Sequence, residues 1–536
     1  MISKPIFRPF VVLFFILLGS LSPFRSHGQA SIKNGPVSIS IGEVLSTFPI
    51  PRDENFVKIL GIDGDYAFYQ TRRFPAFAPE GRNDNIYFQT IEKRNWKTGE
   101  LIYAATIDET KYRGGLLELH DCFLSQGEVF MLFDVFQKNT DSRILVARKL
   151  DPNGKFQAFK PITKVFTPKS QYGEFMTQWD EKKGELLVFT KGDSKDHEKT
   201  RLSFEGFNRA LEETFSHEII VPSYEEDHFI LVEKIFEDAV HFIDVFPLDD
   251  DKYSVQYRAL GRDGTIKEAS IGFPARIHSL WITRDGSSNY VEGLSSAKDE
   301  NYFAGYFKIA VDLNEGRSRI VKIQGFNDEF TEKIADHRSI MRVTSKSLFG
   351  PKRSSRYRPV WENSMEDGER LLVLSKKIVI YTQGAIAPFD HYVEDLIVVK
   401  MDSVGNFEWY KHIPMRFNPA VEDQARTLMT PANGGVAFFF PNDSKNLKAW
   451  QDSKTRADYG SGEHSTLVYV NSGGKVNYAE MDHETNADEM GYSFLGSQAT
   501  MTPLEEGGST YLVIAKDENK RGEFIFTTVT LEVKKE

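Results

Sequence analysis

The sequence predicts an all-β fold, namely a β-propeller of about eight four-stranded antiparallel blades, with seven blades as the alternative. Short apolar runs rich in Val, Ile, Tyr and Phe recur along the chain, bounded by Gly, Asn, Asp and Pro as strands are. The runs repeat at a nearly constant spacing, and one further strand near the N-terminus has no local partner. Repeats of this length indicate propellers or arrays, so solenoids and tandem sandwiches are the other candidates.

Each repeat consists of two elements. The first is a small or polar turn followed by an apolar run, as in "GEVFMLFDVF" from Gly127 and "GELLVFT" from Gly184. The second is an apolar run, a polar turn that usually contains Gly, and another extended run, as in "ILVARKLDPNGKFQAF". Asn, Asp and Gly in such turns supply the positive φ that hairpins need. Together the two elements predict one four-stranded antiparallel blade.

The turn glycines of the second element set the period. The first two are 55 residues apart, and the next step of 110 is twice that length because the turn near Asn208–Glu212 lacks a glycine. A step of 52 follows, then one of 89 that implies an insertion, and finally one of 69. These glycines are Gly99, Gly154, Gly264, Gly316, Gly405 and Gly474.

The eighth repeat is one strand short, because the chain ends at Glu536 where its outer hairpin turn is expected. Near the N-terminus, "VSISI" (Val37–Ile41) alternates apolar residues with Ser and has no partner strand close by in the sequence. We expect this strand to complete the last blade, because that closes the ring and removes an exposed sheet edge.

The first thirty residues have the pattern of a secretory signal peptide. Lys4 and Arg8 precede the apolar run Phe10–Gly19, and small residues Gly28 and Ala30 follow at the positions of a cleavage site. A transmembrane anchor is the alternative, but the run is short for a bilayer. The sequence thus predicts a leader over 1–30, cleavage near Ala30, and a single propeller domain over 31–536 that is exported to the periplasm or secreted.

Charge and cysteine content narrow the classes of partner. The net charge is −11, and it becomes −14 without the three basic residues of the leader, with 63 basic against 77 acidic residues. Such an acidic body argues against nucleic acid as a partner.

The only cysteine, Cys122, is predicted to be a buried core residue. Because no cysteine lies near the cleavage site, the sequence does not predict a lipoprotein. No later apolar stretch is long enough to span a membrane.

One repeat carries a family resemblance. "LIVVKMDSVGNFEWYKHI" resembles the repeat of secreted bacterial β-propeller-like proteins, in which an apolar strand, Lys-x-Asp-x-x-Gly-Asn and a strand with Trp recur. The "GQA" end of the leader is similar to that of exported proteins of Bacteroidota-type bacteria. The resemblance implies a propeller fold and a cell-envelope or secreted location, and it implies no catalytic residues.

Motifs that carry catalytic chemistry are missing from the sequence. It contains no Gly-x-Ser-x-Gly, His-Glu-x-x-His, Gly-x-x-x-x-Gly-Lys or Gly-x-Gly-x-x-Gly. Its twelve histidines are scattered, and acidic clusters such as Asp249–Asp251 lack the alternating spacing of a calcium loop. The sequence therefore predicts no cofactor and no metal.

A basic segment is the best candidate site. An insertion at about 325–362 contains a helical pattern at Asn327–Ile340, and from His337 to Trp361 it has seven Lys or Arg and no Asp or Glu. We expect an anion-binding loop for an acidic glycan, a phosphate or a protein partner, although a solvated loop is the alternative. Its residues are Arg338, Arg342, Lys346, Lys352, Arg353, Arg356, Tyr357 and Arg358.

These observations predict an exported, non-enzymatic binding or assembly module of the bacterial envelope or extracellular space. The alternative is a hydrolase or lyase that acts on polysaccharide or peptide, with paired carboxylates on the central propeller axis.

Overall fold

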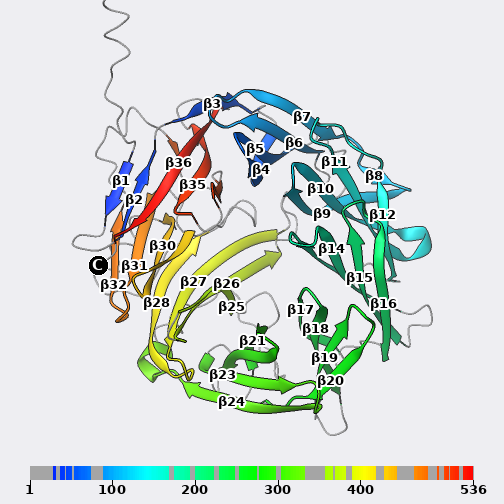
Figure 1. Cartoon of the computed structure of the whole chain (residues 1–536), viewed down its shortest axis with the longest axis vertical. Coiled ribbons are helices and arrows are strands. Elements are labelled where there is room, and N and C mark those ends of the chain that lie inside the picture. Colours follow the sequence, from blue (N-terminus) through cyan, green and yellow to red (C-terminus); the bar gives the residue numbers. More distant parts are fainter. Residues whose placement is uncertain are drawn as a thin grey trace, which may run out of the picture.

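The computed structural model is built almost entirely from antiparallel strands, and its sheets are arranged around a central space (Figure 1). It describes residues 28–31, 37–42, 44–50, 54–73, 88–167, 174–193, 199–222, 229–247, 253–273, 277–296, 303–331, 357–365, 368–381, 389–417, 428–442, 464–480, 492–493, 500–505, 508–517 and 523–534.

The recurring unit is a four-stranded antiparallel sheet, as predicted, and we number these units in chain order. Units 4 and 5 are joined into one eight-stranded sheet by a parallel bridge between Ser270 and Arg317. The number of blades stays a prediction. The strands of the first four units are β4 (Glu54–Asp63), β5 (Tyr66–Arg73), β6 (Phe88–Asn95) and β7 (Leu101–Ile107) in unit 1; β9 (Gly115–Ser125), β10 (Glu128–Gln137), β11 (Ser142–Leu150) and β12 (Lys160–Phe166), with the short β8 (Lys111–Tyr112), in unit 2; β13 (Glu174–Asp180), β14 (Glu185–Asp193), β15 (Lys199–Asn208) and β16 (Glu213–Pro222) in unit 3; and β17 (Phe229–Ile235), β18 (Ala239–Pro247), β19 (Tyr253–Gly261) and β20 (Ile266–Ser270) in unit 4.

The later units follow the same order. Their strands are β21 (Ile277–Asp285), β22 (Ser288–Ser296), β23 (Phe303–Asp312) and β24 (Arg317–Gly325) in unit 5; β25 (Tyr357–Ser364), β26 (Arg370–Tyr381), β27 (Phe389–Met401) and β28 (Phe407–Phe417) in unit 6; β29 (Leu428–Ala432), β30 (Gly435–Asn442), β31 (His464–Val470) and β32 (Val476–Glu480) in unit 7; and β34 (Thr500–Pro503), β35 (Thr510–Asp517) and β36 (Glu523–Val533), with the short β33 (Tyr492–Ser493), in unit 8.

The predicted closure by the N-terminal strand is confirmed. β2 (Val37–Ile41) pairs antiparallel with β36, with Val37 opposite Val533, and β3 (Ser46–Pro49) pairs with the earlier part of β36. The first described strands and the last one therefore share one sheet, with β2 beside β36 in Figure 1. A further strand, β1 (Gly28–Ser31), pairs with β2, so a cut after Ala30 would fall inside β1.

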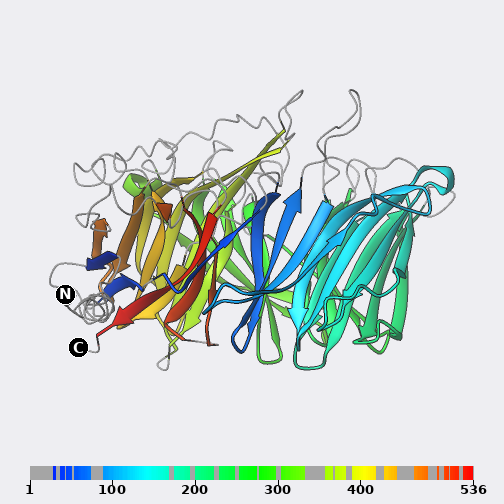
Figure 2. The ribbon, with the colours of Figure 1, turned by 90° about the horizontal axis from the view of Figure 1, so that it is seen from above.

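The tight turns have the predicted conformation. Gly99, Gly154, Gly264, Gly316, Gly405 and Gly474 all have positive φ. The segment "DLIVVKMDSVGNFEWYKHIP" forms the outer hairpin of unit 6, β27 and β28, and Trp409 donates a hydrogen bond of 2.6 Å from Nε1 to the Ser472 carbonyl of unit 7. The tight turns of the early and middle units lie along the lower side of Figure 2.

The core lies between neighbouring sheets. Separate clusters of buried apolar side chains join units 3 and 4, units 4 and 5, and units 5 and 6. Cys122 is 3% exposed and belongs to the core between units 1 and 2, as predicted. Residues 328–331 form a helical turn, and the rest of the expected helical pattern lies outside the described residues. Within the described part of the chain, no helix is long and apolar enough to cross a membrane.

Candidate functional site

A row of side chains on unit 4 faces unit 5. His241 of β18 lies opposite Ala259 of β19, and Ala259 lies opposite Lys267 of β20. Residues that pair across antiparallel strands share one face of the sheet. Two residues further along, the same face carries Ile243 and Tyr257, which belong to the core shared with unit 5. Because side chains alternate along a strand, His241 and Lys267 also point toward unit 5.

Unit 5 presents a matching row in return. Arg284 of β21 lies opposite Asn289 of β22, Asn289 opposite Val311 of β23, and Val311 opposite Ser318 of β24. The next row on this face is apolar and contains Val291, which packs in the same core. The two polar rows therefore face each other at the tight-turn end of the interface, just beyond the end of the core.

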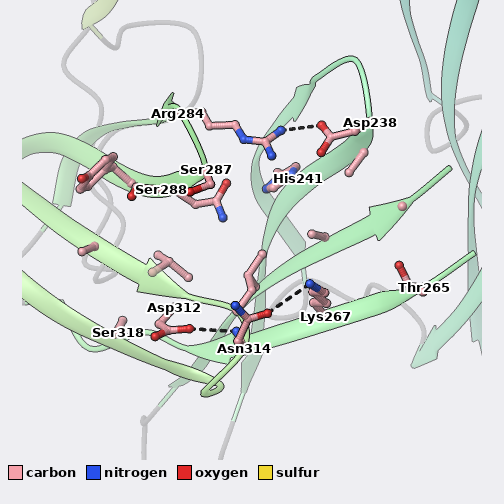
Figure 3. Close-up of a pocket in the computed structure, with 18 of the residues that line it drawn as sticks. Asp238, His241, Thr265, Lys267, Arg284, Ser287, Ser288, Asp312, Asn314 and Ser318 are labelled. Carbon is pink, nitrogen blue, oxygen red and sulfur yellow. Dashed lines mark hydrogen bonds and ion pairs between the residues drawn. The ribbon is translucent and has the colours of Figure 1, made fainter. Parts of the chain in front are cut away.

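A cavity of about 1170 Å³ lies between the two rows and is lined by residues of both units. Figure 3 shows Lys267 and Asn314 on one side of it, and Arg284, Asp238, His241 and Ser288 on the other. Pockets of roughly 300–1,000 Å³ hold drug-sized ligands, so this cavity has room for more than a single ion. The tight turns and the strand ends beside them contribute Asp238, Asp263, Ser287, Ser288, Asp312 and Asn314 to its lining.

Equivalent positions are filled by an ion pair at the two preceding interfaces. Arg209, in the outer turn of unit 3, donates from Nε to Glu128 of unit 2 at 2.8 Å. Arg262, in the outer turn of unit 4, pairs with Glu185 of unit 3, and its guanidinium lies 4.8 Å from the centre of the Phe215 ring. We call this interaction between an outer-turn Arg and a Glu of the preceding unit the clamp.

The clamp residues are replaced between units 4 and 5. Glu128 and Glu185 are the first residues of β10 and β14, and the corresponding first residue of β18 is Ala239. Arg209 and Arg262 directly follow the third strand of their units, and the residue that follows β23 is Leu313. Ala and Leu are smaller than the Glu–Arg pair and cannot form an ion pair, so the space at this level stays open.

The charges around the cavity leave one lysine without a carboxylate partner among the described residues. Three of the lining arginines pair with carboxylates. The side chain of Arg319 lies on the opposite face of β24 from that of Ser318. The Nζ of Lys267 instead donates to Asn314 Oδ1 at 3.2 Å. The three ion pairs are Arg262 with Glu185, Arg284 with Asp238, and Arg317 with Glu315.

The lining aspartates are already used by the protein. Asp263 accepts hydrogen bonds from the backbone N–H and the hydroxyl of Thr265, and Asp312 accepts from the N–H groups of Asn314 and Glu315. Such contacts hold hairpin turns in shape. The pKa of Asp238 is lowered by its hydrogen bond with Arg284. The carboxylates of Asp263 and Asp312 are thus turned toward their own hairpins, and Lys267 forms no ion pair with a carboxylate among the described residues.

His241 is neutral in this site. Burial lowers its pKa to about 4, and the nearby charge of Arg284 acts in the same direction. Its Nδ1 lies 2.7 Å from the hydroxyl of Tyr257, whose pKa is raised by burial. At neutral pH the pair therefore offers hydrogen-bonding groups and no charge.

The cavity also holds an unused acceptor. Asn289 is buried, and its Oδ1 has no hydrogen-bond partner among the described residues. Leaving a buried polar atom without a partner costs free energy, so such atoms usually bind water or a ligand. The hydroxyls of Ser287, Ser288 and Ser318 line the same space.

The other face of unit 5 is closed by a buried ionic cluster. Glu292 accepts hydrogen bonds from Arg370 of unit 6 at 2.9 and 2.8 Å, from Tyr306 at 2.8 Å and from Thr283 at 2.9 Å. Lys308 lies 3.2 Å from the same carboxylate. Burial opposes ionisation of Glu292, but Arg370 and Lys308 lower its pKa overall. One sheet thus has a sealed face and a face with a cavity.

A second polar group lies on β9, on the inner side of unit 2 in Figure 1. A register shift between β9 and β10 leaves His120 in a bulge, and Glu118 lies opposite Asp134. Asp134 is bound by Arg143, whose Nε donates to it at 3.0 Å. Burial and the charge of Asp134 raise the pKa of Glu118, and burial lowers the pKa of His120. Bulges often accompany functional sites because they redirect a side chain.

Most of the predicted basic segment falls outside the described residues, namely Arg338, Arg342, Lys346, Lys352, Arg353 and Arg356. Tyr357 begins β25, is 3% exposed and packs in the core between units 5 and 6, so its ring contributes to stability there. Arg358 follows on the same strand and is exposed. Anion binding by this segment stays a prediction.

The described residues contain no group of three or more His, Cys, Asp or Glu side chains placed to hold a metal ion.

No protein-family model and no curated protein match the chain. Among solved structures it is similar to the β-propeller domain of the Trilobed protease from Pyrococcus furiosus, with 12% identity, a TM-score of 0.32, and coverage of 73% of this chain and 90% of that one. It is also similar to a variant of the Synechocystis apocarotenoid oxygenase, with 10% identity, a TM-score of 0.34, and coverage of 87% and 96%. The Bombyx mori GH32 β-fructofuranosidase BmSUC1 has 10% identity and a TM-score of 0.24, with coverage of 97% and 96%. Similarity at this level assigns no activity to the chain.

Sequence reasoning did not find the cavity between units 4 and 5. Its residues come from seven strands and four turns, and none of them forms a local motif. In the aligned outer turns Arg209 and Arg262 are followed in the next repeat by Leu313. The corresponding residues of units 1, 2, 6 and 7 are Trp96, Asp151, Asp402 and Asn471, so this difference alone does not single out the interface between units 4 and 5.

Proposed function

We propose that the protein is an exported, non-enzymatic β-propeller that binds a negatively charged ligand in the cavity between units 4 and 5. The observation that carries the proposal is Lys267, which lines a cavity of about 1170 Å³ and pairs with no carboxylate among the described residues, while the lining aspartates bond to their own turns or to Arg284. Electrostatic attraction to such a site favours an anion even though the protein as a whole is acidic. Export rests on the leader pattern of the first thirty residues.

A non-enzymatic role is supported by the ionisable groups of the cavity. His241 is neutral and bonded to Tyr257, and Asp238 is held by Arg284. A general base must be free to take a proton and a general acid free to give one near neutral pH. The described groups here meet neither condition, so the cavity is suited to binding.

The proposal is tested by thermal unfolding with a panel of anions, namely phosphate, sulfate, citrate and D-glucuronate. Binding to the folded state raises the melting temperature, and above the dissociation constant the rise grows with the logarithm of the ligand concentration. At least one anion should stabilise the wild-type protein, and Lys267→Gln should lose that effect while Lys182→Gln, on an exposed turn residue, keeps it. Equal shifts in the wild type and in Lys267→Gln would contradict the proposal.

The second candidate is a hydrolase or lyase whose site lies on the central side of unit 2. It is favoured by the group on β9, where a carboxyl group with a raised pKa lies near a histidine with a lowered one. Such a pair suits general acid–base catalysis on a polysaccharide or peptide. Incubation with acidic and neutral polysaccharides and with casein, followed by assays of reducing ends and free amines, tests it. Activity that Glu118→Gln abolishes would establish this candidate in place of the binding module.

A further inference from the structure

We propose that the ligand of the cavity between units 4 and 5 is a sugar acid of the uronic acid type, free or at the end of an oligosaccharide. This inference rests on the proposed anion binding and adds the chemical class of the ligand. It combines the charge at Lys267, the unused acceptor at Asn289, and the serine hydroxyls between them.

The charge of the site fits a monoanion. The Nζ of Lys267 pairs with no carboxylate among the described residues, and Arg284 is neutralised by Asp238. A phosphate group carries up to two negative charges and is usually bound by several donors, often from arginine. One lysine ammonium instead matches one carboxylate. The ligand therefore has a carboxylate in place of a phosphate.

The acceptor at Asn289 requires a donor on the ligand. Its Oδ1 is buried without a partner among the described residues, so a ligand that supplies a hydroxyl removes the cost of that unsatisfied atom. Sites built around such polar groups discriminate strongly against analogues that lack the matching group. A simple carboxylate such as acetate has no hydroxyl to offer, whereas a sugar acid has several.

The remaining surface of the cavity suits several hydroxyl groups. Ser287, Ser288, Ser318, Thr265 and Asn314 line it, and each is both a donor and an acceptor of hydrogen bonds. At about 1170 Å³ the space exceeds what a single small carboxylate fills. A sugar acid, alone or with a second sugar unit attached, uses both the volume and the hydroxyl groups.

The test is isothermal titration of the full chain with D-galacturonate, D-glucuronate and digalacturonate. D-galactose has the hydroxyls without the charge, and acetate and inorganic phosphate have the charge without the hydroxyls of the sugar. We expect at least one uronate to bind tenfold or more tightly than galactose, acetate and phosphate. Lys267→Gln should weaken that binding at least tenfold and Asn289→Ala about fivefold, whereas Lys182→Gln leaves it unchanged.

The possible outcomes distinguish a failure of the sugar-acid proposal from a failure of the proposed anion binding. Acetate or phosphate binding as tightly as the uronates, with Lys267→Gln weakening all of them, overturns the sugar acid but keeps an anion site. Galactose binding as tightly as the uronates removes the role of the carboxylate. No binding of any anion overturns the proposed function as well. If Asn289→Ala does not fold, Lys267→Gln alone decides, because its side chain is exposed and its loss leaves the core intact.

Discussion

The interface between units 3 and 4 and the interface between units 4 and 5 are built from corresponding strands, yet one is closed and the other holds a cavity. At the first, Glu185 and Arg262 form the clamp, Thr214 donates to Glu185 at 2.5 Å, and His217 Nε2 lies 2.8 Å from the Arg262 carbonyl. At the second, Ala239 and Leu313 take the clamp positions.

The cavity coincides with the change of residues at the clamp positions, and the sheets on both sides of it are well packed. Below the clamp level both interfaces have continuous apolar cores, which contain Phe189 and Phe242 at the first and Ile243 and Val291 at the second. The open interface also differs in its strand edges, because a parallel bridge between Ser270 of β20 and Arg317 of β24 joins units 4 and 5.

The largest expected effect comes from breaking the clamp between units 3 and 4. Arg262→Leu leaves the Glu185 carboxylate, 8% exposed, without its counterion, and we expect a loss of about 3 kcal/mol in the free energy of unfolding. Chemical denaturation of both proteins measures it. The double variant Glu185→Ala with Arg262→Leu imitates the open interface and removes the buried charge, so it should lose less than Arg262→Leu alone. A double variant that is less stable than the single one would show that the clamp does not act as an ion pair.

A smaller effect is expected from pH at the open interface. The pKa of His241 is about 4 in the folded protein and near 6.5 when unfolded, so the unfolded chain binds the additional proton. Stability is therefore complete above pH 6.5 and is lost as pH falls from 6.5 toward 4. From pH 7.5 to pH 5 the loss due to His241 is on the order of 2 kcal/mol. Unfolding curves of wild type and His241→Gln should differ by this amount at pH 5 relative to pH 7.5. Parallel curves would contradict the neutral state of His241.

The smallest effect concerns Asn289 in the absence of ligand. Because its Oδ1 has no partner among the described residues, Asn289→Ala removes no hydrogen bond at that atom, and we expect a change within about 0.5 kcal/mol. At the closed interface, Thr214→Ala removes a real bond to Glu185, so a loss of about 1 kcal/mol is expected there. Denaturant midpoints of the two variants provide the comparison. A loss of more than 1.5 kcal/mol in the free energy of unfolding of Asn289→Ala would mean that the Asn289 side chain makes stabilising contacts in the free protein.

The sequence predicts the architecture well because the repeat is encoded locally. Gly264 and Gly405 mark hairpin turns through their positive φ, and the alternation in Val37–Ile41 identifies the strand that closes the last sheet against β36. The same pattern does not reveal the cavity, because Lys267 and Asn289 meet only when two sheets pack face to face. The sequence pattern also does not predict the burial of Tyr357, since the basic residues around it suggest an exposed loop.

Rebuilding the clamp between units 4 and 5 should close the cavity. The variant Ala239→Glu with Leu313→Arg places at the open interface the residue types that close the preceding one, and D-galacturonate binding to it and to the wild type is measured by isothermal titration. We predict that the variant folds, with a melting temperature no lower than that of the wild type by more than a few degrees. Its affinity for galacturonate should fall at least tenfold, because the Glu and Arg side chains fill the cavity. A folded variant that binds galacturonate as tightly as the wild type would contradict the account.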